Sequence, residues 1–285
     1  MSEEKHYPVQ RLCEYLHISR GAYYRWLKNP VSFSERYNRK LSEKIKNIHE
    51  KHPDMGYRRI RDELDKKHGI AVNDKRVLRI CRIEHIQSTI KWKPKSCTRN
   101  SDKSTHIAKN YLNREFLADA PNKKWLTDVT EFKYYIGVEV HKIYLSAILD
   151  LYDRRIVAYK TSSHNDNPLV MNTFDEAVAL EPDAHPLFHS DRGFQYTSKP
   201  FCSRLKKHHM KQSMSRVAHC IDNGPMEGFW GILKREMYYG KKFTSKGDLI
   251  IAVESYISYY NTERIQRKLH LMTPAEFHDH FNAAA

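Results

Sequence analysis

The stretch WLTDVTEFKYY, residues 125–135, decides the fold class of this chain of 285 residues. HKIYLSAILD (141–150) and RRIVAYKT (154–161) follow it, and all three segments are rich in Val, Ile, Tyr and Thr. The short turn sequences IGVE and LYDR separate them, so we predict three consecutive antiparallel strands. The middle segment is almost entirely apolar, as in a strand that is covered on both faces.

Two more strands and several helices are predicted after residue 162. In chain order they are a helix capped by Asn165 or Asp166, a short strand at 187–191, a helix around Phe201 and Leu205, a short strand at 211–215, a helix that begins at 222–225, and an amphipathic helix through 249–260. The order βββαβαβα describes an α/β fold, with a mixed five-stranded sheet and helices on both faces.

The region before residue 91 has the periodicity of helices instead. Residues 7–27 predict two short helices, with Ser19 as the N-cap of the second, in a helix-turn-helix pattern, and residues 41–81 predict a second helical unit. The segment KWKPKSCTRNSDK (91–103) is basic and polar, which is typical of a linker. The expected organisation is an N-terminal helix-turn-helix over 1–33, a second helical DNA-binding domain over 34–90, a basic linker over 91–121 and the sheet domain over 122–285.

The formal net charge of +15 is concentrated in the first part of the chain. Residues 1–120 contain 27 Lys and Arg against 15 Asp and Glu, whereas residues 121–285 contain 22 against 19. A basic excess in one part of a chain is typical of contacts with the phosphate backbone of nucleic acid. The alternative interpretation is that the charge only keeps the protein in solution.

Composition disfavours several classes of protein. The five cysteines are scattered and form no CxxC pair, so we expect reduced thiols and no zinc site. No apolar run approaches the roughly 18–20 residues of a membrane span, and the N-terminus lacks the apolar stretch of a signal peptide. We therefore expect a cytoplasmic, nucleoid-associated protein without membrane contact. Without a GxxxxGK(S/T) or GxGxxG run, a nucleotide-driven ATPase or a dinucleotide enzyme is also disfavoured.

Asp128, Asp191 and Glu227 are the main candidates for chemistry. The first two are separated by 62 residues and the last two by 35, and each is predicted on a separate element. Carboxylates on separate elements can hold two Mg²⁺ ions roughly 3.5–4 Å apart, which activate an attacking oxygen and stabilise a leaving one at phosphorus. A single Asp at a strand end is more often a turn-forming residue, and Asp150 and Asp153 around LYDR are explained in this way.

Eight motifs occur in a fixed order along nearly the whole chain. They are MGYRRIRDEL (55–64), NDKRVLRI (73–80), WLTDVTEF (125–132), LDLYDRRIVAY (149–159), HSDRGFQYTS (189–198), QSMSR (212–216), DNGPMEGFWGILKRE (222–236) and YYNTERIQRKLHLMTPAEF (259–277). In this order they resemble the DDE transposase and retroviral-integrase superfamily, and within it the OrfB-type transposases of the insertion-sequence-three family. The resemblance implies a ribonuclease H-like catalytic core preceded by all-α helix-turn-helix units.

The resemblance also implies roles for single residues. Asp128, Asp191 and Glu227 would converge as the catalytic, metal-binding triad, with two Mg²⁺ ions as cofactor and Mn²⁺ as a substitute. Lys234 would contact the terminal DNA; it lies seven residues after Glu227, and positions i and i+7 share a helix face. The stretch 217–219 departs from the family pattern, which leaves the loop contacts there open. The segment that the family's first reading frame supplies is missing, so this chain alone is expected to be less competent than a frameshifted fusion.

Basic side chains on the predicted helices and linker are candidates for DNA contact, with solvated surface charges as the alternative. They are Arg20, Arg25, Arg58, Arg59, Lys75 and Arg76 in the helical domains, Lys91, Lys93 and Lys95 in the linker, and Arg192, Arg216 and Lys234 in the sheet domain.

The expected function is that of a Mg²⁺-dependent DDE transposase, a polynucleotidyl transferase that cuts DNA at the ends of a bacterial insertion sequence and joins the 3′-OH to target DNA. Expected partners are double-stranded DNA (terminal inverted repeats and target), at least one further copy of the chain, and the first-reading-frame product or a fusion with it. Two alternatives stay open. One is a catalytically idle DNA-binding regulator of the same element. The other is a nuclease for RNA or hybrids, which helix-turn-helix units disfavour because they fit the grooves of duplex DNA.

Overall fold

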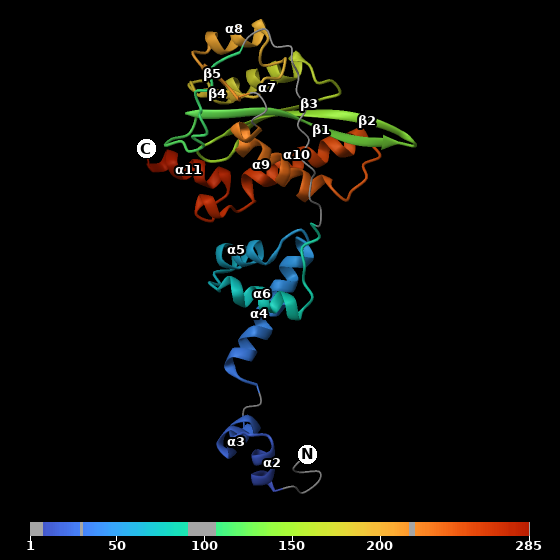
Figure 1. Cartoon of the computed structure of the whole chain (residues 1–285), viewed down its shortest axis with the longest axis vertical. Coiled ribbons are helices and arrows are strands. Elements are labelled where there is room, and N and C mark those ends of the chain that lie inside the picture. Colours follow the sequence, from blue (N-terminus) through green and yellow to red (C-terminus); the bar gives the residue numbers. More distant parts are fainter. Residues whose placement is uncertain (1–7, 29–30, 91–106, 217–219, 285) are drawn as a thin grey trace. The chain divides into compact units, whose positions relative to one another are not determined.

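The computed structural model describes residues 8–28, 31–90, 107–216 and 220–284. They fall into two compact units, Met1–Thr89 and Ile90–Ala285 (Figure 1). No helix in the four described ranges is long and apolar enough to cross a membrane.

Two short helices begin the first unit, α2 (Val9–Tyr15) and α3 (Arg20–Lys28). The Ser19 hydroxyl accepts a hydrogen bond from the Ala22 amide at 3.1 Å, which confirms Ser19 as the cap of the second helix. Cys13 is buried, whereas Trp26 is 60% exposed. The pair therefore has little apolar core of its own.

Three helices, α4 (Phe33–Lys51), α5 (Tyr57–His68) and α6 (Asp74–Ile83), pack around a second small core. Ser32 and Asn73 accept hydrogen bonds from backbone amides at the starts of α4 and α6. The buried apolar side chains recur at helical spacing, as the sequence predicts, and include Leu41, Ile45, Ile60, Leu64, Val77 and Ile80.

A five-stranded sheet forms the centre of the second unit. Its strands are β1 (Lys124–Ile136), β2 (Glu139–Asp150), β3 (Ile156–Ser162), β4 (Leu187–Ser190) and β5 (Lys211–Met214). The order across the sheet is β3-β2-β1-β4-β5, in which β1, β2 and β3 are antiparallel neighbours while β4 runs parallel to both β1 and β5. The predicted mixed sheet is confirmed, with β1 at its centre.

Helices cover both faces of the sheet (Figure 1). One face carries α7 (Asn167–Leu180) and α8 (Lys199–Lys207), and the other carries α9 (Gly224–Leu233) and α10 (Lys246–Thr262). Trp125 belongs to the core with α7 and α8, whereas its neighbour Leu126 belongs to the core with α9 and α10. Because strand side chains alternate, even-numbered residues of β1 point toward α9.

The remaining short elements connect or end the second unit. They are η1 (Cys220–Asn223), the π-helical turn η2 (Lys234–Tyr238), η3 (Arg267–Leu269) and the last helix, α11 (Pro274–Ala284). The sequence pattern after residue 260 did not predict α11.

Strand β2 departs from the expectation that it is covered on both faces. Its first residues, from Glu139 to Lys142, are mostly exposed, and only its second half is continuously buried. The apolar composition of HKIYLSAILD comes mainly from that second half, which lies between the helical layers.

The end of the linker expected over 91–121 is anchored to the sheet domain. Leu112 is 1% exposed, and the amides of Tyr111 and Leu112 donate to the Ser213 hydroxyl at 2.9 and 3.1 Å. These contacts join residues about a hundred positions apart, so polar composition alone did not reveal them. Residues 91–106 lie outside the described residues.

Candidate active site

Asp128 on β1 and Asp191, just past the end of the neighbouring parallel strand β4, have matching positions. Leu126 of β1 pairs with His189 of β4, and each aspartate lies two residues beyond its member of that pair. Adjacent strands are about 4.8 Å apart, so this register brings the two carboxylates to the same level of the sheet. Asp191 follows directly after the last residue of β4.

Helix α9 brings Glu227 to the same region. Asp128 has an even number and points toward α9, where the Trp230 indole Nε1 donates a hydrogen bond to its Oδ2 at 3.0 Å. Glu227 lies three residues before Trp230, so both share one face of the helix. The indole bond therefore fixes the Glu227-bearing face of α9 beside Asp128.

The three carboxylates are electrostatically unfavourable together. Burial raises the pKa of Asp128 from its ordinary value of 3.8 to about 7, and the charges of Asp191 and Glu227 act in the same direction. Burial also raises the pKa values of Asp191 and of Glu227. The site thus disfavours three negative charges, and a bound divalent cation would remove this cost.

The loop after β4 holds Asp191 by backbone geometry. The amide of Gly193 donates to Asp191 Oδ1 at 2.8 Å. A Cβ atom at residue 193 would lie 2.9 Å from Gln195 Oε1 and 3.0 Å from Asp191 Oδ1. A glycine at this position therefore leaves the carboxylate room to keep this conformation.

Lys234 lies beside the same part of β1. Its ammonium group lies 5.2 Å from the centre of the Phe132 ring, and Phe132 shares the α9-facing side of β1 with Asp128. Burial lowers the pKa of Lys234, while the charges of Asp128 and Glu131 oppose that shift. Lys234 begins the π-helical turn η2, a rare structure that is frequent at functional sites.

The chemistry of these donors fits Mg²⁺ or Mn²⁺. All three candidate ligands are carboxylates, which hard divalent cations prefer, and the charges of Asp191 and Glu227 help burial to raise the pKa of Asp128, a repulsion that a cation relieves. Within the described ranges, however, no three His, Cys, Asp or Glu side chains form a ready-made metal cage. The arrangement is an open group of carboxylates, with Glu227 exposed.

The predicted basic residues of the sheet domain have local partners as well. Arg216 donates from Nε and Nη2 to the buried Asp222 at 2.9 Å each, which occupies two of its donors. Arg114 also binds Asp222 at 2.7 Å, so this carboxylate joins the chain before β1 to the turn before α9. Arg192 donates from Nε to the Ser215 carbonyl at 2.8 Å.

The basic residues of the first unit differ in exposure and in their local contacts, and the exposed Arg58 guanidinium lies 5.5 Å from the centre of the Tyr57 ring. Arg20, Arg25, Arg58 and Lys75 are exposed. Arg59 binds Asp54 at 2.7 Å, and Arg76 donates to Asn38 at 2.9 Å. Lys91, Lys93 and Lys95 lie outside the described residues.

Sequence reasoning missed two exposed arginines on α6 and the role of an indole. Arg79 and Arg82 follow Lys75 at i+4 and i+7, so the three form one basic stripe. The helical period of NDKRVLRI could have revealed that stripe. Trp230 is buried in the core between α9 and the sheet and also donates to Asp128; its position three residues after Glu227 was the available signal for that second role.

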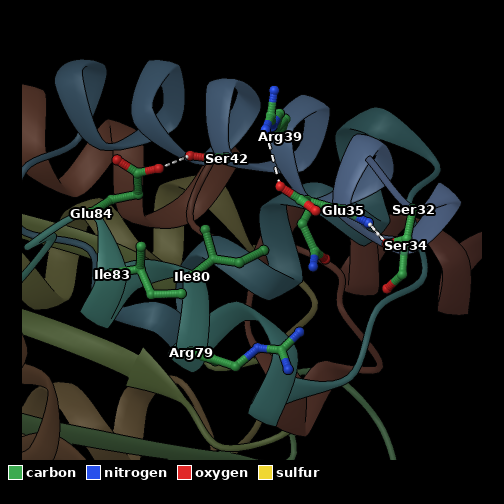
Figure 2. A pocket seen from close by; sticks show the side chains of 10 residues that line it. Ser32, Ser34, Glu35, Arg39, Ser42, Arg79, Ile80, Ile83 and Glu84 are labelled. Atoms are coloured by element: carbon green, nitrogen blue, oxygen red, sulfur yellow. Dashed lines mark hydrogen bonds and ion pairs between the residues drawn. The ribbon is translucent and has the colours of Figure 1, made fainter. Parts of the chain in front are cut away.

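A pocket of about 540 Å³ lies between α4 and α6 (Figure 2). Its lining includes the Glu35–Arg39 ion pair and the Ser42 hydroxyl, which donates to Glu84 at 2.6 Å. Its charges have both signs and are largely paired, so the pocket has no electrostatic preference for a phosphate.

Three family matches cover most of the chain. Residues 118–220 and 227–281 each match an integrase core domain family, and residues 36–94 match an HTH-like domain family. Among solved structures, the chain is similar to the HTLV-2 integrase catalytic core domain in complex with magnesium, with a TM-score of 0.43 and 20% identity over 56% of this chain and 98% of that one.

Several curated relatives are transposases of insertion sequences. The chain is 38% identical to the InsK transposase of insertion sequence element IS150 from Escherichia coli (strain K12), over 95% of this chain and 93% of that protein. It is 26% identical to the InsF transposase of insertion sequence IS3A from the same organism, over 96% of both. The chain therefore belongs to the insertion-sequence-three family of transposases, with a helical HTH-like region followed by a ribonuclease H-like integrase core.

Proposed function

We propose that this transposase cuts DNA at the ends of its insertion sequence and joins them to target DNA, in a reaction that needs Mg²⁺. The observation that carries the proposal is the common location of Asp128, Asp191 and Glu227. The first two have matching positions on parallel strands, and Glu227 lies on a helix that the Trp230–Asp128 bond fixes beside them. Outside such a site, three converging carboxylates would only destabilise a fold.

The reaction consists of two displacements at phosphorus. In the first, the oxygen of a water molecule forms a bond to phosphorus, and the bond to the 3′ oxygen breaks to leave a 3′-OH. In the second, the oxygen of that hydroxyl forms a bond to a phosphorus of the target, and the bond from this phosphorus to the target's own 3′ oxygen breaks to leave a 3′-OH on the target strand. Neither step requires a covalent intermediate with the protein.

The protein residues orient the reactants and balance charge. Two Mg²⁺ ions, held by Asp128, Asp191 and Glu227, would supply Lewis acidity for the attacking and leaving oxygens. Lys234 would hold a phosphate oxygen beside them, and its contact with Phe132 restricts where its ammonium group lies. The Gly193 amide and the Trp230 indole keep two of the carboxylates oriented between turnovers.

The first unit would select the DNA. The stripe formed by Lys75, Arg79 and Arg82 on α6 presents cations at helical spacing, as expected of a helix that lies in a groove. Because two element ends must be cut and joined, we propose that at least two copies of the chain act together on DNA. We also propose that each copy acts with the first-reading-frame product, either as a separate protein or fused to it.

The test uses labelled duplexes that carry the ends of the element, with Mg²⁺ or Mn²⁺. We expect nicked and strand-transferred products from the wild-type chain, and neither product from Asp128→Asn, Asp191→Asn or Glu227→Gln, each of which should still bind the duplex. Undiminished activity in any one variant would contradict the assignment of that residue. Binding of the ends by the wild-type chain, with no cleavage under either metal, would favour the idle regulator instead.

A further inference from the structure

Helix α9 and the residue before it present one row of side chains to β1. The members of the row recur at helical spacing, and they are Asn223, Glu227, Trp230 and Lys234. At one end of the row, Asn223 Nδ2 donates a hydrogen bond to the Thr127 carbonyl at 3.2 Å. Farther along, the Trp230 indole donates to Asp128. Glu227 therefore lies between two bonds that attach α9 to consecutive residues of β1.

The Glu227 side chain has no bond of its own that would fix it. It is exposed, and its carboxylate accepts no hydrogen bond from another described residue. Successive residues of an α-helix are rotated by roughly 100°, so a rotation of α9 by one residue would turn Glu227 away from Asp128. The location of this carboxylate thus depends on how the first turns of α9 lie on β1.

Asn223 departs from the usual behaviour of an asparagine at the start of a helix. Such a residue ordinarily accepts a hydrogen bond from a backbone amide of the first turn, but Asn223 makes no bond of this kind. It is 4% exposed, and its Oδ1 has no hydrogen-bond partner within the part of the chain that the structure describes. A buried acceptor without a partner costs stability. An exception to a local rule at such a cost is typical of a functional site.

The residue before Asn223 anchors the same turn to the rest of the sheet domain. Asp222 is 0% exposed and accepts hydrogen bonds from Arg114 at 2.7 Å and from Arg216 at 2.9 Å. These ion pairs hold the backbone of the turn. The bond from Asn223 to Thr127 then sets how the turn meets β1, directly before Asp128.

We propose that Asn223 is a positioning residue for Glu227. Its bond to the Thr127 carbonyl sets the rotation of the first turns of α9, so that the Glu227 carboxylate converges with Asp128 and Asp191. The inference rests on the proposed function, because it concerns Glu227 as a ligand of divalent metal. It makes the affinity for metal depend on an uncharged side chain that bonds to the backbone of β1.

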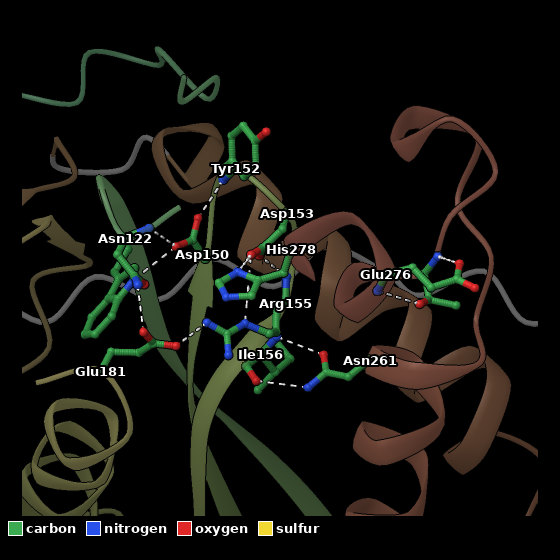
Figure 3. Close-up of polar contacts among 12 residues, drawn as sticks. Asn122, Asp150, Tyr152, Asp153, Arg155, Ile156, Glu181, Asn261, Glu276 and His278 are labelled. Carbon is green, nitrogen blue, oxygen red and sulfur yellow. Dashed lines mark hydrogen bonds and ion pairs between the residues drawn. The ribbon is translucent and has the colours of Figure 1, made fainter. Parts of the chain in front are cut away.

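The test compares two asparagines with opposite hydrogen bonding. Asn223→Ala removes one bond together with the unpartnered Oδ1, and these effects offset each other, so its melting temperature in EDTA should stay within about 2 °C of the wild-type value. Asn261 is the matched control, because it accepts from the Ile156 amide and donates to the Ile156 carbonyl, each at 3.0 Å (Figure 3). Asn261→Ala should melt about 5 °C lower, since both backbone groups of Ile156 lose their partner.

Metal affinity is measured from the rise in melting temperature as MgCl₂ is added, which depends on the ratio of metal concentration to dissociation constant. Asn223→Ala should raise the apparent dissociation constant for Mg²⁺ by about 10-fold, as is typical when a residue that orients a metal ligand is lost. Asn261→Ala should leave it unchanged. Glu227→Gln should also raise it, and adding Asn223→Ala to Glu227→Gln should have no further effect, because Asn223 acts through Glu227. Cleavage of element ends by Asn223→Ala should recover as the Mg²⁺ concentration rises.

The outcomes separate this inference from the proposed function. Equal dissociation constants for Asn223→Ala and the wild-type chain would overturn the inference and leave the proposed function intact. A further loss of affinity on adding Asn223→Ala to Glu227→Gln would also overturn it, since Asn223 would then act on the metal without Glu227. A melting temperature of Asn223→Ala as low as that of Asn261→Ala would assign Asn223 a structural role and overturn the inference as well. A wild-type chain that neither responds to Mg²⁺ nor cuts the element ends would overturn both proposals.

Discussion

Two aspartate pairs in the same sheet domain have opposite surroundings. Asp128 and Asp191 lie at the candidate active site, whereas Asp150 and Asp153 lie at the turn after β2. In each pair, burial and a neighbouring carboxylate act against ionisation, which raises the pKa of Asp128 to about 7 and that of Asp150 to about 6. Perturbed pKa values alone would not tell the two pairs apart.

The second pair is surrounded by donors (Figure 3). Asp150 accepts from the amides of Asn122 and Tyr152 at 2.6 and 2.7 Å and from the Trp125 indole at 3.2 Å. Asp153 accepts from the Arg155 amide at 2.8 Å and lies 2.7 Å from His278 Nδ1. Both aspartates are 0% exposed, so no ligand can reach them.

The active-site pair has fewer donors and more access. Asp128 accepts hydrogen bonds from the Trp230 indole and the Val129 amide, and Asp191 accepts one from the Gly193 amide. Both residues are only partly buried. A buried carboxylate that is fully hydrogen-bonded stabilises a turn, while one left partly unsatisfied and reachable is suited to bind a cation. The comparison teaches that the donors around a carboxylate indicate its role better than its pKa does.

The largest expected effect comes from exchanging the two kinds of aspartate for asparagine. Asp191→Asn should reduce strand cleavage by about 10³-fold with little change in melting temperature, because it removes ligand charge and keeps the bond from Gly193. Asp153→Asn should lower the free energy of unfolding by about 3 kcal/mol, because Arg155 and His278 lose their counter-charge. Gel assays and thermal melting measure the two effects. A stability loss in the first variant and an activity loss in the second would reverse the comparison.

Without divalent metal, Asp128→Asn should stabilise the protein at neutral pH. The folded chain holds the Asp128 proton up to a pKa of about 7, against an ordinary value of 3.8, so ionisation costs stability progressively between these pH values. In EDTA, the melting temperature of Asp128→Asn should therefore exceed that of the wild-type chain by an amount that grows from pH 4 to pH 7 and stays constant above pH 7. The contrasting variant, Asp150→Asn, should be less stable throughout, because its new amide group faces the donors of Asn122 and Trp125. A gain that is independent of pH would contradict the electrostatic explanation.

A smaller effect is expected from removing each pair's indole donor. Trp230→Phe should lower the cleavage rate by about 10-fold and raise the Mg²⁺ concentration needed for half-maximal rate, because Asp128 loses a hydrogen bond to a charged group. Trp125→Phe is the matched control: it removes the donor to Asp150 and should affect melting temperature without changing the Mg²⁺ requirement. Equal Mg²⁺ titrations for the two variants would show that the Trp230 bond does not position Asp128.

The smallest effect concerns the attachment of α11. The hydrogen bond with Asp153 raises the pKa of His278, so the bond's contribution is fully present below pH 6.5 and is lost as pH rises through the higher folded value. Arg155 opposes this shift, and Glu181, which binds Arg155, supports it. The free energy of protection of the α11 amides against hydrogen exchange should therefore fall by about 1 kcal/mol as pH rises. His278→Gln should remove this dependence on pH. Protection that falls equally in the variant would assign the effect to another group.

Most elements of the fold could be predicted because their signals are local. Alternation marks the strands, Ser19 and Asp166 mark helix starts, and apolar residues at helical spacing mark α4 to α6. Local sequence signals were insufficient where an element is held by residues far away in the chain. Leu112 is buried in the sheet domain although its sequence neighbours are polar. Helix α11 depends on aromatic contacts of Phe277 and Phe281 with Tyr152.

The sequence by itself determined the order of elements, the basic first part of the chain and the identity of three carboxylates in ordered motifs. Only the tertiary structure decided which aspartates have donors, because Trp230 reaches Asp128 and His278 reaches Asp153 across more than a hundred residues. It also decided that Lys133 and Lys142 face each other, since strand register depends on the pairing of whole strands. Spacing along a chain fixes periodicity, but the surroundings of a charge are set by residues that only folding brings near it.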